Sequence, residues 1–479
     1  MLGHLTDRLP SECRERVALG VLAALLLGGS LVRLWLMVSV RPALVGYADS
    51  YAYITSAIGP LFSDTLRPAG YPFFLRSVHW VNANLSATIL LQHALGLASA
   101  LLLYLAARRF GLSRWWSLLP AGVIALGGPQ ILIEHAPLTE ALFVFLQSAA
   151  MYAAARAVGP RDWAWAVGVG LLAGATATVR TLGLVLAAAL VVWLLLASGG
   201  SWRRRLLRGG ATLAATLVVL GAYVVAQESE TGYTGLTRAG DWNLYGRVGP
   251  FADCEQFTPP DGTRVLCEET PEGERPGPNS YIFGPGTPAV GAFEDPFRAS
   301  PEENERVGEF ARAALRNQPL DWLDQVVTED LVRYVASDRI VRESGQGLSF
   351  DGLQDVLVTG PQAGQTSAAI ARWYSTSGQY LNEGRLDAFF EFERITRVVG
   401  PLFVLLALLA LIGPVLARGA ARRGAWLFLL VALVSILGPP ATLFYDARYA
   451  IPAFGPLAAA AAVGGAAAGG RLLARRRRA

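Results

Sequence analysis

The sequence contains no lysine, so every one of its 41 basic residues is an arginine. It is also poor in charge: Asp, Glu, Lys and Arg together make up 16% of the 479 residues, whereas hydrophobic residues make up 53%. A soluble globular protein carries about 25% charged residues, so this composition excludes an ordinary soluble enzyme of the same length. We expect a membrane protein, and the lysine-free, alanine- and glycine-rich composition favours a bacterial source with a GC-rich genome.

Metal-binding and nucleotide-binding signatures are also missing. The four histidines (His4, His79, His93 and His135) form no HExxH motif, and the three cysteines form no CxxC motif. The sequence has no glycine-rich phosphate loop, so neither ATP nor a dinucleotide is expected. The net charge of +4 comes from short arginine clusters beside apolar blocks, a pattern that argues against a nucleic-acid partner. No cofactor is predicted.

Two of the three cysteines, Cys254 and Cys267, share one long polar stretch. If that stretch faces an oxidising compartment, a disulfide between them would close a short loop rich in proline and glycine. The alternative is a pair of unpaired buried thiols.

The hydrophobic residues fall in blocks of roughly 17 to 25 residues, the length that a helix needs to cross a bilayer. These blocks are continuous rather than alternating, which predicts helices and not a β-barrel. The fold class is therefore an all-α polytopic membrane protein with about ten transmembrane helices, the first an uncleaved signal anchor. The predicted helices cover Val17–Val40, Leu85–Ala107, Trp115–Ile133, Leu138–Arg156, Trp163–Val179, Leu182–Ala197, Leu206–Ala226, Val398–Ala417, Trp426–Phe444 and Tyr449–Ala468.

The arginine clusters test this helix count, because cytoplasmic loops are enriched in basic residues. All clusters fall on one side only if the chain breaks at Arg180. We therefore predict a multi-pass protein of the bacterial plasma membrane, with both termini in the cytoplasm and the active site outside. The clusters are Arg8/Arg14/Arg16, Arg108/Arg109/Arg114, Arg156/Arg161, Arg203/Arg204/Arg205/Arg208, Arg418/Arg422/Arg423 and Arg475/Arg476/Arg477/Arg478.

This topology divides the chain into three parts. Residues 1–227 form an N-terminal transmembrane module, whose first outer loop at 41–84 is the predicted catalytic loop. Residues 228–396 form an extracytoplasmic domain that is loop-rich at first and then helical at Pro301–Asn317 and Asp321–Ala336. Residues 397–479 form the C-terminal helices and a basic cytoplasmic tail.

Asp49 is the first acidic residue after the first predicted helix, directly before an apolar and aromatic run that suits an interfacial helix. A carboxylate in this position can act as a general base toward an attacking hydroxyl, which contributes roughly 10²–10⁴-fold in rate. The alternative is that Asp49 caps the helix that follows it. Spacing alone does not choose between the two.

Other polar residues of the predicted outer side suit anion or substrate binding. Arg67 precedes a rigid turn that also carries Tyr71, and it suits either a phosphate or an interfacial anchor. Glu134, His135 and Glu140 flank a predicted helix start. Capping accounts for part of that pattern, but Glu140 lies inside an apolar block, where an ionisable residue is usually functional.

Arg180 also lies between two apolar blocks and needs an anionic partner. This partner is either a substrate phosphate or Glu140. If it is Glu140, Arg180 belongs to a structural ion pair. Asp446 and Arg448 lie at the outer end of the last predicted helix, where a local ion pair is the simpler interpretation.

Five of these segments, in this order, resemble motifs of the GT-C superfamily of membrane glycosyltransferases, the protein mannosyltransferase, aminoarabinose transferase and arabinofuranosyltransferase kin. The resemblance implies inverting transfer of a sugar from a polyprenyl-phosphate donor to a glycan, lipid or protein acceptor, with Asp49 as base and outer arginines on the phosphate. Many relatives carry two adjacent acids in the first loop, but Ser50 follows Asp49 here, so a metal-independent reaction is favoured over one that uses a divalent metal. The segments are Asp49–Tyr53, Arg67–Pro72, Leu138–Phe143, Thr178–Arg180 and Arg448–Ala453.

Two other classes of protein remain open. A lipid-linked saccharide flippase or other transporter would also carry intramembrane acids and arginines, but near the bilayer midplane and in paired halves. A non-catalytic envelope scaffold would use its outer domain to bind a wall polymer.

Overall fold

The computed structural model describes residues 11–45, 47–159, 163–199, 201–335, 368–375 and 380–476. Within these ranges the chain is almost entirely helical, and its strands are limited to one antiparallel pair, β1 (Val40–Arg41) with β2 (Tyr380–Leu381). The fold is thus the predicted all-α polytopic membrane fold.

Each predicted apolar block forms a helix or a bent pair of helices. In the described part of the chain, six helices are long and apolar enough to cross a membrane, or seven if one bent pair counts as a single span. Two others, α9 and α10, are apolar but only 17 and 16 residues long, so crossing by all the blocks stays a prediction. The helices are α2 (Ser11–Ser39), α5 (Leu85–Arg109), α6 (Arg114–Leu126) with α7 (Gly128–Glu134), α8 (Thr139–Ala157), α9 (Trp163–Val179), α10 (Leu182–Ala197), α11 (Trp202–Thr231), α21 (Gly400–Leu416), α22 (Gly419–Thr442) and α23 (Ala447–Arg476).

The surface of this bundle suits a bilayer. Large apolar side chains of α2, α11 and α21 are exposed, and exposed tryptophans mark the helix ends. Trp163 and Trp202 are the first residues of α9 and α11, and Trp35 lies near the end of α2, as in the aromatic belts of membrane proteins. Examples of the exposed apolar residues are Leu27, Leu31, Leu34, Leu213, Leu217, Val218, Leu405, Leu408 and Leu411.

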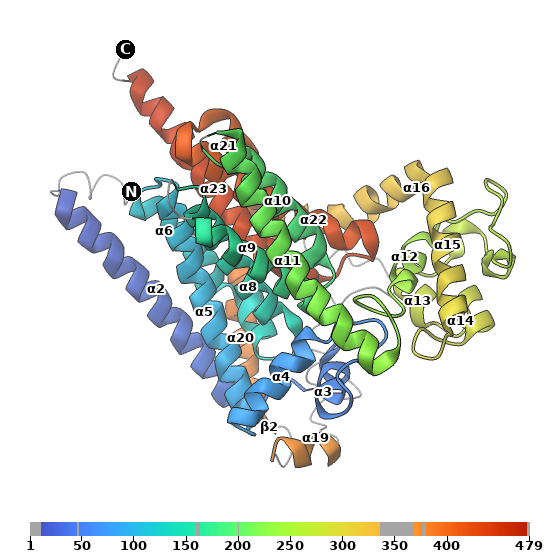
Figure 1. Ribbon diagram of the computed structural model, residues 1–479. Helices are drawn as coiled ribbons and strands as arrows, with labels where there is room; N and C mark the ends of the chain where they lie inside the picture. Colours follow the sequence, from blue (N-terminus) through green and yellow to red (C-terminus); the bar gives the residue numbers. More distant parts are fainter. Residues whose placement is uncertain are drawn as a thin grey trace.

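The arginine-rich helix ends meet at one end of the bundle, called the basic end below. The start of α2 and the end of α23 both lie there (Figure 1). Polar contacts of arginines tie neighbouring helices together at this end. They join Arg114 to Glu15 (3.3 Å), Arg423 to the carbonyl of Ala197 (3.4 Å), Arg471 to the carbonyl of Leu416 (3.1 Å), and Arg208 to the carbonyl of Gly159.

A break in the third predicted block was not expected. Helices α6 and α7 meet at an angle of 47° at Gly127. Here α20 (Glu383–Thr396) packs across α7 so closely that a Cβ on Gly128 would lie 2.4 Å from the Cα of Glu393. Helix α20, which the sequence placed with the outer segment, therefore packs into the main core through Leu386 and Phe389.

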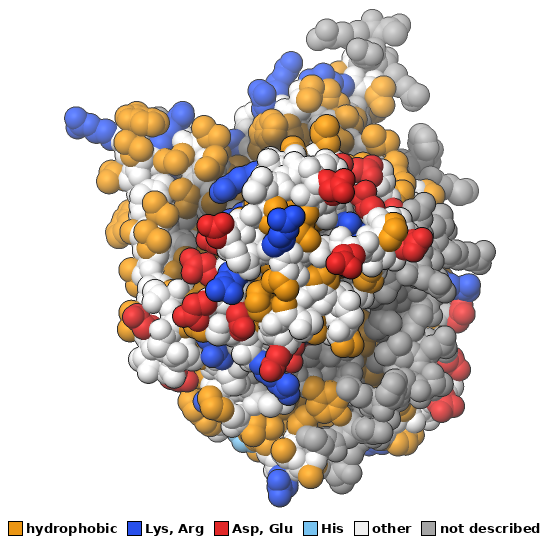
Figure 2. Space-filling view, turned by 90° about the vertical axis from the view of Figure 1, so that its right-hand side faces the viewer, with side chains coloured by type: hydrophobic (Ala, Val, Ile, Leu, Met, Phe, Trp, Pro, Cys, Tyr) orange, Lys and Arg blue, Asp and Glu red, His pale blue; other side chains and the backbone are white. Residues whose placement is uncertain are grey.

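The part of the inserted segment at residues 239–322 packs around a core of its own that contains Trp242, Tyr245, Tyr281 and Phe310. It lies beside the bundle, and Figure 2 shows its charged side chains facing outward. Cys254 and Cys267 form a disulfide within it. Its helices are α12 (Asp241–Val248), α13 (Pro278–Phe283), α14 (Pro288–Phe293), α15 (Pro301–Asn317) and α16 (Pro319–Asp324), with short turns η1 (Arg264–Leu266) and η2 (Glu272–Glu274). The π-helix η3 (Gln325–Leu331) and α17 (Val332–Val335) follow, and Tyr334 of α17 packs in the main core.

This second core also contains Leu66, Phe444 and Tyr449, which come from the membrane part of the chain. Leu66 lies in the connection between α3 (Ser50–Ile58) and α4 (Gly70–Val81), and Tyr449 lies in the first turn of α23. The inserted segment is therefore packed against the two stretches that carry Arg67 and Arg448.

Candidate active site

Asp49 lies in the turn just before α3. The preceding residue, Ala48, has a φ of 48°, in the left-handed region that L residues adopt rarely and often at functional sites. Asp49 occupies the N-cap position, but its side chain makes no capping hydrogen bond. Its carboxylate instead accepts hydrogen bonds from Arg67 Nη2 at 2.5 Å and from Arg448 Nη2 at 2.6 Å. The capping alternative therefore does not describe how this side chain is used.

The surroundings of Asp49 decide its charge. Burial by itself would favour the protonated acid, but the guanidinium groups of Arg448 and Arg67 more than offset it and hold the pKa of Asp49 well below its usual range. The side chain is 20% exposed, so an incoming molecule can reach it. Asp49 is thus ionised at neutral pH, and while both arginines hold it, it is a weak base.

The segment around Arg67 is fixed by local hydrogen bonds. Asp64 Oδ1 accepts hydrogen bonds from the backbone N–H groups of Leu66 and Arg67, an Asx turn, and Asp64 Oδ2 pairs with Arg67 Nη1 at 2.9 Å. Gly70 then allows a close approach to the end of α9, because a Cβ at this position would lie 2.4 Å from the carbonyl oxygen of Thr178. The Arg67 segment is thereby held beside the segment that carries Arg180.

Arg448 and Arg180 share a second acid. Glu140, which is fully buried at the start of α8, pairs with Arg180 Nη1 at 2.7 Å and lies 3.8 Å from Arg448 Nη1. Both guanidinium carbons lie 4.7 Å from the ring centre of Tyr449, at cation–π distance. The residues Asp64, Arg67, Asp49, Arg448, Glu140 and Arg180 thus form a continuous chain in which acids and arginines alternate.

Asp446 adds a further acid to this chain. Its Oδ1 accepts the backbone N–H of Arg448 at 3.0 Å, and its Oδ2 lies 3.4 Å from Arg448 Nε. Burial raises the pKa of Asp446, although Arg448 acts in the opposite direction. Asp446 therefore competes less strongly for Arg448 than Asp49 does.

Two of the predicted site residues, Glu134 and His135, lie elsewhere. Glu134 is fully buried and pairs with Arg33 (Nε to Oε2, 2.8 Å) and with His93 Nδ1 (3.0 Å). His135, also fully buried, lies between His93 (3.0 Å) and the backbone carbonyl of Val40 (3.0 Å). Both side chains are paired inside the bundle, because the predicted outer loop at Glu134 is packed under α2 and α5, and this favours a structural role.

Tyr71 lies between the residues around Asp49 and the buried residues around Glu134. Its ring meets Tyr53 edge-on, with 5.2 Å between ring centres, and its hydroxyl donates to Gln92 Oε1 at 2.5 Å. Gln92 in turn donates to the carbonyls of Glu134 and Ala136. Tyr71 is fully buried, so it supports the site from behind rather than lining it.

Sequence reasoning did not include Asp64, His93 or Gln92 in the site or its support. The role of Asp64 could have been predicted, because an aspartate side chain often accepts a hydrogen bond from the backbone two residues further on, in an Asx turn. Arg33 lies inside the first apolar block, but its partner Glu134 is 101 residues away and no local pattern joins them.

The inserted segment braces the stretches that bear the site arginines. In α16, Trp322 Nε1 donates to the carbonyl of Ala441 at 3.0 Å, and α17 places Tyr334 edge-on to Tyr445 with ring centres 5.0 Å apart. Asp330 of η3 is held by a buried ion pair with Arg247 at 2.5 Å. π-Helical turns are frequent at functional sites, and this one lies against the turn that leads to Arg448.

The first outer segment is held by the same domain. Thr65 Oγ1 donates to the carbonyl of Pro296 at 2.8 Å, and the N–H of Ala239 donates to the carbonyl of Thr65 at 2.9 Å. Within the described residues, no three His, Cys, Asp or Glu side chains are grouped as a metal site would need. The cationic groups of this site are guanidinium groups.

No protein-family model and no curated protein sequence matches the chain. Solved structures do resemble it. One is the protein O-mannosyltransferase complex of S. cerevisiae bound to the sugar donor, with 16% identity and a TM-score of 0.36 over 52% of this chain and 38% of that one. Another is the oligosaccharyltransferase of Archaeoglobus fulgidus in complex with an inhibitory peptide and a dolichol-phosphate, with 12% identity and a TM-score of 0.45 over 95% of this chain and 51% of that one.

A third is ArnT from Cupriavidus metallidurans bound to undecaprenyl phosphate, with 14% identity and a TM-score of 0.38 over 94% of this chain and 78% of that one. The chain thus spans about half or less of the first two proteins. The function proposed below rests on the residues of the site.

Proposed function

We propose that this protein is a membrane glycosyltransferase that moves a sugar from a polyprenyl-phosphate donor to a hydroxyl of an envelope glycan, lipid or protein. The observation that carries the proposal is the carboxylate of Asp49 held by two arginines, Arg67 and Arg448, within an alternating chain of acids and arginines. Such a chain offers both a base and several cations, the two kinds of group that transfer from a phosphate requires.

The arginines suit the phosphate of the donor. Guanidinium groups bind phosphate oxygens in a bidentate manner, and they stay charged at any physiological pH. Arg180 is 16% exposed and is stacked on Tyr449, and its ion-pair partner in the described part of the chain is Glu140. A phosphate that entered here would compete with Asp49 for Arg448 and Arg67.

This competition gives Asp49 its role in the proposal. Once a phosphate engages the arginines, their hold on Asp49 weakens and its pKa rises toward the usual range, so the carboxylate becomes a better base. The acceptor oxygen then attacks the anomeric carbon, and the bond from that carbon to the phosphate oxygen breaks. The hydroxyl proton passes to Asp49, and the polyprenyl phosphate leaves with its charge neutralised by the arginines. A single displacement of this kind inverts the anomeric centre.

The same geometry supports a metal-independent reaction. Both oxygens of Asp49 already accept hydrogen bonds from arginines, and Ser50, in place of a second acid, donates its hydroxyl to the carbonyl of Tyr47 at 2.7 Å. We propose that the arginines neutralise the leaving phosphate in place of a divalent ion. Transfer by protein treated with EDTA should therefore equal transfer by untreated protein.

The test of the proposed activity uses purified protein in nanodiscs with a panel of polyprenyl-phosphate sugars. Asp49→Asn should lower donor consumption by roughly 10²–10⁴-fold and leave donor binding intact. Asp241→Asn, at a carboxylate 42% exposed in the inserted domain, is the matched control and should stay active. Full activity of Asp49→Asn would remove this residue from the mechanism, and a flippase would move the donor without consuming it.

The proposed orientation places the basic end in the cytoplasm and Asp49 outside. Cys13 near the start of α2 is the free cysteine, so a chain with Cys254→Ser and Cys267→Ser carries one reactive thiol. An impermeant maleimide should label it in permeabilised cells and not in intact ones. Labelling in intact cells would show that Cys13 lies outside the cell, and the proposed orientation would then be reversed.

A further inference from the structure

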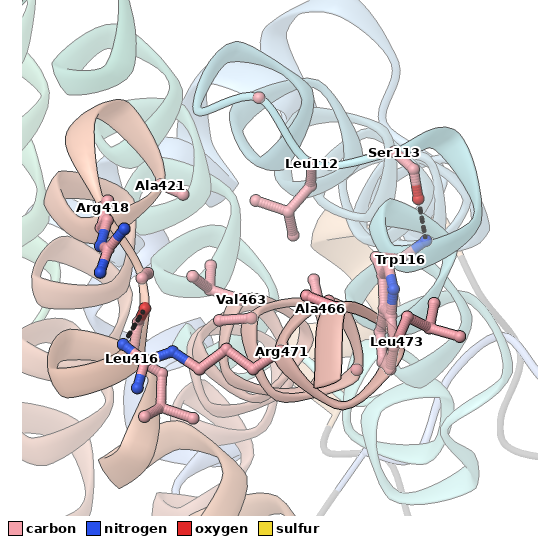
Figure 3. A pocket seen from close by; sticks show the side chains of 16 residues that line it. Leu112, Ser113, Trp116, Leu416, Arg418, Ala421, Val463, Ala466, Arg471 and Leu473 are labelled. Atoms are coloured by element: carbon pink, nitrogen blue, oxygen red, sulfur yellow. Dashed lines mark hydrogen bonds between the residues drawn. The ribbon is translucent and has the colours of Figure 1, made fainter. Parts of the chain in front are cut away.

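A cavity lies at the basic end, at the opposite end of the bundle from Asp49. Its volume is about 760 Å³, within the usual range of small-molecule sites. Figure 3 shows that it opens between the turn that joins α5 to α6, the turn that joins α21 to α22, and the last turns of α23. Nothing in the proposed transfer reaction uses this cavity.

The walls of the cavity are apolar. Leu112, Trp116 and Leu473 face it on one side, and Val463 and Ala466 line its floor (Figure 3). The last turns of α23 leave the space open because they carry glycines. At Gly469 and at Gly470, an added Cβ would meet no atom within 4 Å.

The rim of the cavity is cationic. Arg418 and Arg471 lie on the same side of it (Figure 3), and Arg471 is anchored by its hydrogen bond to the carbonyl of Leu416 at 3.1 Å. None of the described residues that line the cavity is acidic. Two guanidinium groups above an apolar slot match a molecule with a phosphate at one end and a hydrocarbon chain at the other.

We propose that this cavity binds an anionic phospholipid from the leaflet at the basic end. Its phosphate pairs with Arg418 and Arg471, and one acyl chain follows the wall formed by Leu112, Trp116 and Leu473. Basic pockets between transmembrane helices are known places for anionic head groups. A free phosphate would leave the apolar wall uncovered, and a zwitterionic lipid would set its own cation against the two arginines.

The first test measures lipid binding to delipidated protein in a neutral detergent by native mass spectrometry. Phosphatidylglycerol should bind, and phosphatidylcholine should bind at least tenfold more weakly. The variant Arg418→Gln/Arg471→Gln should lower the affinity for phosphatidylglycerol by about 30-fold, since each arginine contributes about 1 kcal/mol near a membrane surface. The control Arg203→Gln/Arg204→Gln removes the same charge from exposed positions of α11 and should change the affinity less than about twofold.

A second test keeps both arginines and fills the slot. Gly470→Leu should displace phosphatidylglycerol, whereas Gly210→Leu, at an exposed glycine of α11 that also has no atom within 4 Å of an added Cβ, should not. Equal binding of phosphatidylcholine, equal loss in the two double-arginine variants, or retained lipid in Gly470→Leu would each overturn the proposal. Displacement of the lipid by millimolar inorganic phosphate would also overturn it, because the site would then recognise the phosphate alone.

Discussion

Arg448 Nη2 lies 2.6 Å from Asp49 Oδ2, although 399 residues separate the two in the chain. The ion pair joins the first outer segment to the last helix, and Arg448 also meets Glu140 and Asp446. Arg448 is thus the residue at which the acids of the site meet, and a change there tests the site as a whole.

Arg448→Gln should weaken binding of a polyprenyl phosphate by about ten- to a hundredfold, because a hydrogen bond to a charged group contributes about 1.5–3 kcal/mol. Arg448→Lys keeps the positive charge but loses the planar guanidinium that can bind a phosphate through two hydrogen bonds. It should therefore bind the polyprenyl phosphate more tightly than Arg448→Gln and more weakly than the unchanged protein. Titration of nanodisc-embedded protein with the polyprenyl phosphate measures both. Arg298→Gln, at a side chain 72% exposed in the inserted domain, should bind like the unchanged protein. An unaltered affinity in Arg448→Gln would separate this arginine from the phosphate.

Acid should remove the stabilising effect of Asp49. Its pKa is lower in the folded protein than the value of about 3.9 expected in an unfolded chain, so its ion pairs stabilise the fold fully above that value. The contribution is then lost as the pH falls toward the lowered pKa. The difference in melting temperature between the unchanged protein and Asp49→Asn should be largest near pH 6 and should shrink near pH 3. A difference that grows on acidification would contradict the lowered pKa.

Gly70→Ala tests the close approach of the Arg67 segment to α9. The added Cβ would lie 2.4 Å from the carbonyl oxygen of Thr178, so the backbone must move and the two arginine-bearing segments must separate. We expect a loss of transfer activity larger than the loss of thermal stability. Gly221→Ala in α11, where an added Cβ meets nothing within 4 Å, should leave both unchanged. Normal turnover in Gly70→Ala would show that this spacing is not needed.

Asp330→Ala tests the brace formed by the inserted domain. The pair with Arg247 is buried, with side chains 6% and 1% exposed, so removal of the acid leaves an unpaired buried guanidinium. The expected loss is about 3–5 kcal/mol of folding free energy. Asp241→Ala breaks the pair with Arg312, whose side chains are 42% and 41% exposed, and should cost less than about 1 kcal/mol. Thermal denaturation in one detergent compares the two variants, and equal losses would refute the structural importance of the Arg247 pair.

The sequence predicted the helical bundle well because each span is specified locally. An apolar run sets the length of a helix and the arginines beside it set its direction, so each block forms where expected. The bend between α6 and α7 was not predictable, because it depends on α20 packing against Gly128 from 265 residues further along the chain.

The same distinction holds for the site. Asp49, Arg67, Glu140 and Arg180 fall on one side of the predicted topology, and in the structure Asp49 pairs with Arg67 and Glu140 pairs with Arg180. Glu134 was assigned to the same group because it follows a predicted span. In the structure it is buried inside the bundle, where Arg33 pairs with it. A sequence does not show which distant charged residues pair in this way.

The contact between Asp49 and Arg448 has a consequence for biosynthesis. Ribosomes release the chain from its N-terminus, so Asp49 leaves the ribosome long before Arg448 does. A chain that stops before α23 therefore retains its aspartate and Arg67 but has no complete anion site. Under the proposed function, transfer therefore requires the insertion of α23, because this helix supplies Arg448.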